Sequence, residues 1–291
     1  MKRLLAALVA LLVVSAASAQ NMSGATQTLK IWDNTTAPHS NGLEKPGEIR
    51  NNRPALTTEA ILYLYTPKSG EHNGRGVVIC PGGGYRHLSM ENEGSQMAEW
   101  FAAHGYVAAV LHYRMPNAHP EVPLEDASEA IRILRGKREG IDPKWQVETV
   151  GIAGSSAGGH LAAMTSTMGE ERPDFSLLFY PVITAKEGKL HKGSFDHLLG
   201  EKRSKKLSEY YSLENRVTKQ TPPALILYAD DDRTVPSVNG PLYYIALKEQ
   251  GIEASLHIYP YGGHGFGMKD SFHYKHSWMP LMLDWIDTIL K

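Results

Sequence analysis

A pentapeptide with a serine at its centre is the most reactive pattern in this chain. Gly154-Ser155-Ser156-Ala157-Gly158 has the form Gly-x-Ser-x-Gly and follows the apolar run Val150–Ala153. At such a strand-to-helix corner the serine hydroxyl projects above the sheet, and the flanking glycines leave room for the tight turn. The pattern therefore predicts Ser156 as a nucleophile and the backbone N–H of Ala157 as one donor to a developing oxyanion.

A serine hydroxyl is a weak nucleophile at neutral pH and needs a base that is itself held by an acid. His264 is the expected base, because it lies in the Gly-rich loop 262–266 after the last apolar strand. The acid lies among three adjoining aspartates that follow the preceding strand. Asp232 is best placed to reach an imidazole before the chain turns into the next helix. Asp230 and Asp231 suit loop hydrogen bonds and stay open as alternatives.

A second glycine-rich turn, Pro81–Tyr85, follows the apolar run Gly76–Cys80. Consecutive glycines let backbone N–H groups point inward, so Gly83 and Gly84 are expected to complete the oxyanion site. The turn lacks the Gly-Lys-Ser/Thr ending of a phosphate-binding loop.

Other reactive side chains indicate no second chemistry. The single Cys80 lies in an expected buried strand with no basic neighbour, so it should pack as a small hydrophobe. His87, His112 and His160 lie on different elements without metal-ligand spacing, so neither a metal nor another cofactor is expected. His257 lies inside a strand and is expected to be a structural residue.

The alternation of apolar strands and amphipathic helices predicts the scaffold that positions these residues. Expected strands cover residues 76–80, 107–113, 150–153, 177–180, 224–228 and 255–259, with an edge strand at 60–65; expected helices cover 94–104, 124–138, 160–168, 237–250 and 277–290. This order is typical of an α/β fold with a mostly parallel, twisted sheet and helices on both faces. Ligands bind such sheets beyond the carboxyl ends of the strands.

The chain divides into three expected parts. Residues 1–19 have the basic start, apolar run and small-residue ending of a signal peptide, which predicts a secreted or periplasmic protein. The polar stretch 20–58 is expected to be an arm packed on a catalytic domain, 59–291. Within that domain the long charged segment 184–218 is expected to form a helical insertion over the site. No later apolar run could span a membrane, and a net charge of -1 does not suggest a nucleic-acid partner.

Five motifs stand out in order: Pro81–Tyr85, Glu93-Gly94, Tyr113–Pro116, Gly154–Ala162 and Gly262–Phe266. With them, residues 58–291 resemble the acetylxylan esterase-like branch of the bacterial α/β-hydrolases, which includes xylanase B-like proteins and acetyl or feruloyl esterases. The resemblance implies the α/β-hydrolase fold and a triad of Ser156, Asp232 and His264. It also implies an acetylated, in some members feruloylated, plant polysaccharide such as xylan as substrate. A short acyl slot beside the glycine turn and Tyr85 would fit an acetyl group.

Other functions fit the sequence less well than that of a serine esterase. A peptidase or amidase could use the same triad, but prolyl-type peptidases usually add a propeller domain that this chain is too short to hold. A lipase would need a large apolar lid, whereas residues 184–218 are rich in Lys, His and Glu. A non-catalytic binding protein of this fold would not need serine, aspartate, histidine and glycine turn together. The sequence therefore predicts a secreted serine esterase that works through an acyl-enzyme.

Overall fold

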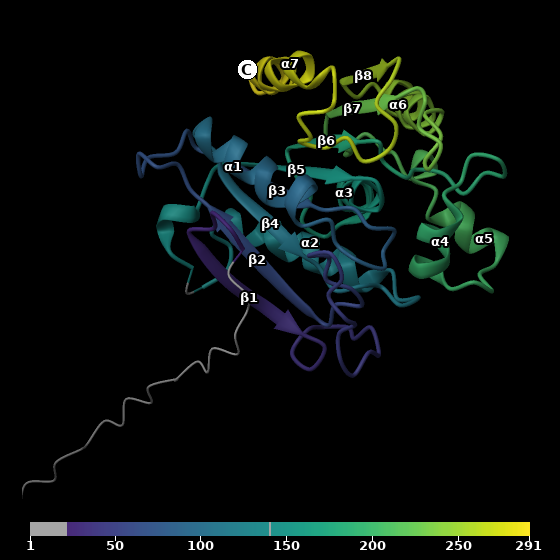
Figure 1. The fold of residues 1–291 in the computed structure, drawn as a ribbon, viewed down its shortest axis with the longest axis horizontal. Helices are drawn as coiled ribbons and strands as arrows, with labels where there is room; N and C mark the ends of the chain where they lie inside the picture. Colours follow the sequence, from purple (N-terminus) through teal and green to yellow (C-terminus); the bar gives the residue numbers. More distant parts are fainter. Residues whose placement is uncertain (1–21, 140) are drawn as a thin grey trace, which may run out of the picture.

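The strands of the described residues form one eight-stranded sheet. The computed structural model describes residues 22–139 and 141–291, so the expected signal peptide lies outside the described residues. The strand order is β1-β2-β4-β3-β5-β6-β7-β8 (Figure 1). From β4 to β8 neighbouring strands are parallel, while β2 runs antiparallel to both β1 and β4.

The strands are β1 (Gln27–Asp33), β2 (Glu59–Tyr65), β3 (Arg75–Cys80), β4 (Val107–His112), β5 (Thr149–Ser155), β6 (Phe175–Phe179), β7 (Ala224–Ala229) and β8 (Ala254–Tyr259). The α-helices are α1 (Gln96–Ala103), α2 (Glu121–Leu134), α3 (Ala157–Met168), α4 (Lys192–Leu199), α5 (Lys205–Tyr210), α6 (Asn239–Glu249) and α7 (Lys275–Ile289). Short helical turns are η1 (Glu91–Ser95), η2 (Pro143–Trp145) and η3 (Leu213–Asn215).

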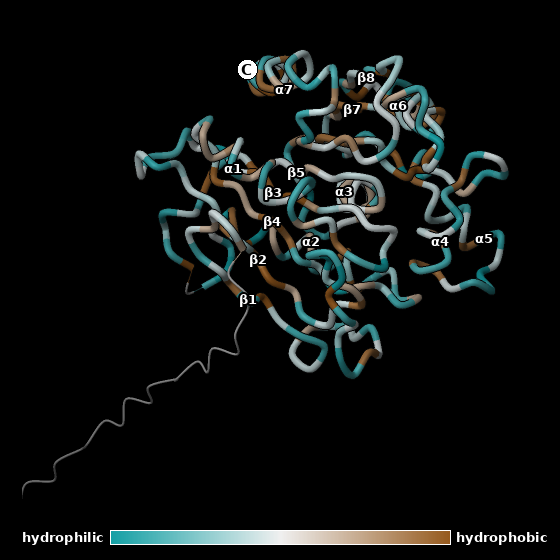
Figure 2. The backbone as a smooth tube through the Cα atoms, in the orientation of Figure 1, coloured by the Kyte–Doolittle hydropathy of each residue, from teal (hydrophilic) through white to brown (hydrophobic). Residues whose placement is uncertain are grey.

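The central strands are mostly apolar and buried. In β3, the side chains of Val77, Val78 and Ile79 are fully buried, and Figure 2 shows the strands as the hydrophobic interior of the molecule. Parallel strands covered by helices on both faces need such continuous apolar runs.

Helices cover both faces because the chain changes direction across the sheet. The α1 connection leads from β3 to β4, whereas α2 and α3 lead from β4 to β5 and on to β6, in the opposite direction. Right-handed crossovers in opposite directions place their helices on opposite faces. The rings of Trp100 in α1 and Trp278 in α7 lie 6.5 Å apart on one face, and α2 contacts α3 on the other. The predicted α/β fold is confirmed.

The prediction that residues 60–65 form an edge strand is wrong. β2 pairs with β4 on one side and with β1 on the other, and its last six residues are buried. β1, from the polar stretch 20–58, therefore forms the edge. The side chains on both faces of β2 are apolar, as is typical of an interior strand.

Two helices near the site begin earlier than expected. The helix expected at 94–104 starts with the π-helical turn η1, and the helix expected at 160–168 starts at Ala157, directly after the pentapeptide serine. Gly158 and Gly159 are poor helix formers, so sequence alone favours a later start. Residues 184–218 contain α4, α5 and η3.

Candidate active site

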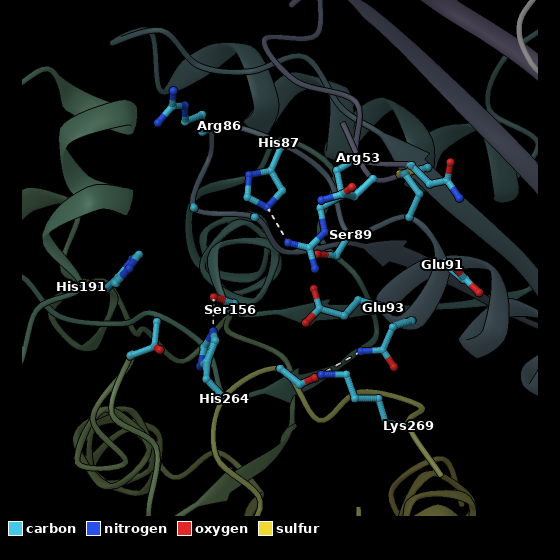
Figure 3. Close-up of a pocket in the computed structure, with 18 of the residues that line it drawn as sticks. Arg53, Arg86, His87, Ser89, Glu91, Glu93, Ser156, His191, His264 and Lys269 are labelled. Atoms are coloured by element: carbon cyan, nitrogen blue, oxygen red, sulfur yellow. Dashed lines mark hydrogen bonds between the residues drawn. The ribbon is translucent and has the colours of Figure 1, made fainter. Parts of the chain in front are cut away.

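Ser156, His264 and Asp232 are joined by two hydrogen bonds. His264 Nε2 lies 2.8 Å from Ser156 Oγ (Figure 3), and His264 Nδ1 lies 2.7 Å from Asp232 Oδ2. The three residues follow β5, β8 and β7, so they meet at the carboxyl edge of the sheet. Because the carboxylate accepts from Nδ1–H, Nε2 carries the lone pair that can take the serine proton.

The three adjoining aspartates have separate partners. Asp232 is buried, and two backbone N–H groups of the following turn donate to its Oδ1 at 2.8 and 2.9 Å. This leaves Oδ2 for His264. Asp231 accepts the backbone N–H of Gly263 in the histidine loop at 2.7 Å, and Asp230 accepts a serine hydroxyl at 3.1 Å. Of the three carboxylates, Asp232 is the one placed against the imidazole.

The backbone at Ser156 is held in an unusual conformation. Its φ of 55° and ψ of -118° put the residue in a left-handed region that side chains rarely adopt. A Cβ at Gly158 would lie 2.0 Å from the carbonyl oxygen of Cys80, and one at Gly154 would lie 2.2 Å from that of Gly158, so both positions need glycine as expected. Ala157 is the first residue of α3, where a backbone N–H has no acceptor within the helix.

The glycine turn after β3 faces the same cavity. Gly83 and Gly84 line it and have φ angles of 137° and 64°. A Cβ at Gly83 would lie 1.9 Å from the carbonyl oxygen of His87, so only glycine fits. Together with the N–H of Ala157, this turn can supply donors to a tetrahedral oxyanion.

The Tyr85 side chain lies beneath the glycine turn instead of in the cavity wall, where the acyl slot was expected. It is 1% exposed, and its hydroxyl lies 2.9 Å from Nδ1 of His160. His160 Nε2 lies 2.9 Å from the carbonyl oxygen of Tyr211, so Nε2 carries the proton and Nδ1 accepts from Tyr85. Burial lowers the pKa of His160 to about 4 and keeps the ring neutral. Tyr85 thus ties the turn to α3 and to the insertion.

Glu93 is a buried carboxylate in the cavity to which the sequence analysis gave no role. Its Oε2 accepts the backbone N–H of Gly82 at 2.9 Å, and its Oε1 accepts the hydroxyl of Tyr180 at 2.8 Å. The Tyr180 ring packs edge-on against that of His264, with centroids 4.9 Å apart. Burial raises the pKa of Glu93, while these two hydrogen bonds oppose the rise. The Glu93-Gly94 motif could have drawn attention to this residue, but a dipeptide does not reveal that its carboxylate is buried.

The cavity has a volume of about 510 Å³ and is bordered by segments far apart in the sequence. The insertion contributes His191 and His197, and His197 Nδ1 lies 2.8 Å from the carbonyl oxygen of Gly84. Burial lowers the pKa of His191. The polar stretch 20–58 contributes residues 51–53, which sequence reasoning did not place at the site.

Of the other reactive side chains, His87 lines the cavity, whereas Cys80 lies outside the lining. Cys80 is fully buried in β3, and burial raises the pKa of its thiol. Among residues 22–139 and 141–291, no three His, Cys, Asp or Glu side chains are arranged to hold a metal ion. Within the same ranges, every helix is too short or too polar to cross a membrane.

The chain is similar to known carbohydrate-active proteins. It is 42% identical over 239 residues to an acetylxylan esterase of Xylanibacter ruminicola, covering 79% of this chain and 48% of that protein. It is 34% identical over 209 residues to an endo-1,4-beta-xylanase B of Butyrivibrio fibrisolvens, covering 65% of this chain and 32% of that protein. The chain thus spans half or less of the length of these curated relatives.

A solved structure and a protein family also match this chain. The crystal structure of an acetyl ester-xyloside bifunctional hydrolase from Caldicellulosiruptor lactoaceticus is 36% identical, with a TM-score of 0.69, and the match covers 79% of this chain and 88% of that chain. Residues 77–268, which include the glycine turn, Ser156, Asp232 and His264, match the family described as alpha/beta hydrolase fold. The chain therefore belongs to the α/β-hydrolase fold family.

Proposed function

We propose that this chain is a serine carboxylic ester hydrolase that removes acetyl groups from acetylated xylan or its oligosaccharides. The observation that carries the proposal is the hydrogen-bonded series Ser156–His264–Asp232, whose serine and histidine line a cavity that the glycine turn also borders. The name of the Xylanibacter ruminicola relative supports acetylated xylan as the substrate.

In the proposed reaction Ser156 Oγ attacks the acetyl carbonyl carbon while His264 Nε2 takes the hydroxyl proton. The carbonyl oxygen becomes an oxyanion that accepts hydrogen bonds from the N–H groups of Ala157 and the glycine turn. Collapse of this intermediate breaks the ester bond, and His264 returns the proton to the departing sugar oxygen. Water then attacks the acetyl-enzyme with the same base, which releases acetate and restores the serine.

The position of Asp232 supports its role in both half-reactions. Its carboxylate is held by two backbone N–H groups and the imidazole, so it can stabilise the imidazolium without being protonated. We propose feruloyl esters as a second substrate class, because the cavity has a volume of about 510 Å³.

The proposal includes export of the protein. The leader-like residues 1–19 support a secreted or periplasmic location. Cell fractionation and N-terminal sequencing of the mature protein test this point, and a retained Met1 in the cytoplasmic fraction would contradict it.

The substrate is tested by mass spectrometry of acetylated xylo-oligosaccharides before and after incubation with the purified protein. We expect loss of acetyl groups with the sugar chain length unchanged, and the Ser156→Ala protein is the matched control. Shortened chains with acetyl groups intact would contradict an esterase and indicate a glycosidase. Unchanged oligosaccharides together with rapid hydrolysis of p-nitrophenyl acetate would contradict the carbohydrate substrate but keep the esterase chemistry.

A further inference from the structure

A tight hairpin of the N-terminal arm places an arginine at the catalytic cavity. Arg50 and Arg53 pair through backbone N···O distances of 3.3 and 2.9 Å, and the two residues between them, Asn51 and Asn52, have φ angles of 50° and 58°. Two successive left-handed residues form the two-residue turn that suits a hairpin, and asparagine tolerates this conformation. Residues 51–53 all line the cavity that contains the catalytic serine. We call residues 50–53 the arm hairpin.

The arm hairpin is fixed to the segment that carries the oxyanion turn. The N–H of Leu56 donates to the carbonyl of Arg86 at 3.1 Å, and the N–H of Leu88 donates to the carbonyl of Pro54 at 2.9 Å. The N–H of Arg86 in turn donates to the carbonyl of Gly83 at 3.1 Å. Backbone hydrogen bonds therefore set the position of the arm hairpin relative to the oxyanion donors.

The positive charge on this side of the cavity has no acidic partner. Within the described ranges, no carboxylate lies at ion-pair distance from Arg53 or Arg86, and both side chains border the cavity. Arg53 Nη1 lies 3.5 Å from Nε2 of His87, and Figure 3 shows the Arg53 guanidinium between His87 and Glu93. Burial lowers the pKa of His87 and the two arginines lower it further, which is the effect of a local positive potential.

The acidic groups of the cavity do not form ion pairs with these two arginines among the described residues. Both oxygens of Glu93 already accept hydrogen bonds, from Gly82 and Tyr180. On the other side of Glu93, Lys269 adds a third cation to the lining.

We propose that the arm hairpin is a subsite for a carboxylate on the substrate, with a uronic acid substituent of an acetylated oligosaccharide as the ligand class. This inference rests on the proposed function. A guanidinium binds a carboxylate through two parallel hydrogen bonds, which an ammonium group cannot do. The amides of Asn51 and Asn52 can donate to and accept from neighbouring sugar hydroxyls. A neutral sugar would leave the Arg53 charge unmatched.

The test measures binding by calorimetry to the Ser156→Ala protein, which cannot turn over. The probes are a xylo-oligosaccharide that carries one glucuronic acid and the same oligosaccharide without it. We expect about 10-fold tighter binding of the acidic probe, as for one charge-assisted hydrogen-bonded contact at an open site. The preference should shrink when salt is raised from about 0.05 to 0.5 M, because exposed charges are then screened.

Arg53→Gln in the same background should remove the preference and leave binding of the neutral probe within about twofold. Arg53→Lys should retain part of the preference, because lysine keeps the positive charge but lacks the planar guanidinium that forms two parallel hydrogen bonds. Arg50→Gln is the matched control, since Arg50 belongs to the same hairpin but pairs with Glu48 and does not line the cavity. Thermal unfolding checks that the exposed substitutions leave the fold intact.

Equal affinity for the two probes, or an equal loss of both in Arg53→Gln, would overturn the subsite. Failure of the wild-type protein to deacetylate neutral acetylated xylo-oligosaccharides would instead contradict the proposed function. The binding comparison uses unacetylated probes, so the two failures are distinguishable.

Discussion

Acidification should destabilise this protein through His160, the ring that holds Tyr85 under the glycine turn. The ring is 1% exposed, and burial lowers its pKa to about 4 from an ordinary value of 6.5. Between these values the unfolded chain binds a proton at this position and the native chain does not, so stability rises with pH. The stabilisation is fully present above about pH 6.5 and is lost progressively as the pH falls toward 4.

The size of the effect follows from the shift. A difference of about 2.5 pKa units corresponds to about 3 kcal/mol over the whole range, of which about 2 kcal/mol is lost between pH 7.5 and pH 5. Urea unfolding at the two pH values, followed by tryptophan fluorescence, measures this loss in the wild-type protein.

His160→Gln isolates the contribution of this one ring. Glutamine does not titrate, and it can still donate to the carbonyl oxygen of Tyr211. Other histidines with lowered pKa values, such as His112, are present in both proteins and cancel in the comparison. We expect the free energy of unfolding to fall by about 2 kcal/mol less in the variant between pH 7.5 and pH 5, even if its stability at pH 7.5 is lower. The same pH dependence in both proteins would refute the reasoning.

Four further predictions concern turnover. Ser156→Ala should lower kcat on p-nitrophenyl acetate by about 10⁴-fold or more, while Ser155→Ala stays within a few-fold, and the reverse ranking would mean that the elbow is misassigned. Asp232→Asn should lose about 10⁴-fold in kcat because the imidazole tautomer is no longer fixed, whereas Asp230→Asn and Asp231→Asn should lose far less; equal losses would assign the effect to the loop. Among p-nitrophenyl esters, kcat/KM should fall from acetyl through butyryl to octanoyl, because each methylene that crowds the cavity raises the activation free energy by about 1–3 kcal/mol. A preference for octanoyl would indicate a lipase-like enzyme. Glu93→Gln should lower kcat by about 10-fold or more with little change in KM, because an NH2 group replaces one of the two oxygens that accept from Gly82 and Tyr180, so one of these donors loses its acceptor; a change in KM alone would indicate a binding role.

The sequence predicted the parts of the site that follow a local strand-to-loop pattern. Ser156, His264 and the glycine turn each come directly after an apolar strand, so their place at the carboxyl edge could be inferred without knowing which strands pair. Asp232 was favoured over its two neighbours by the same reasoning. The alternation of expected strands and helices was also enough to predict a mostly parallel sheet.

What the sequence could not supply depends on contacts between distant segments. Arg53 reaches the cavity because its hairpin pairs with residues 86–88, and no local pattern announces that pairing. β2 was expected at the edge, because only the addition of β1 from the polar arm makes it an interior strand. The direction of the Tyr85 side chain follows from its backbone φ of 59°, which a residue type does not specify.

The left-handed backbone at Ser156 has an evolutionary consequence. A side chain held in this region costs about 1–3 kcal/mol, and glycine, which carries no hydroxyl, fits it with the least strain. At this position, selection for a more stable fold therefore favours glycine, whereas the proposed reaction requires serine. In a lineage that no longer needs the proposed reaction, this serine should be among the first residues to be replaced, with the rest of the fold left intact.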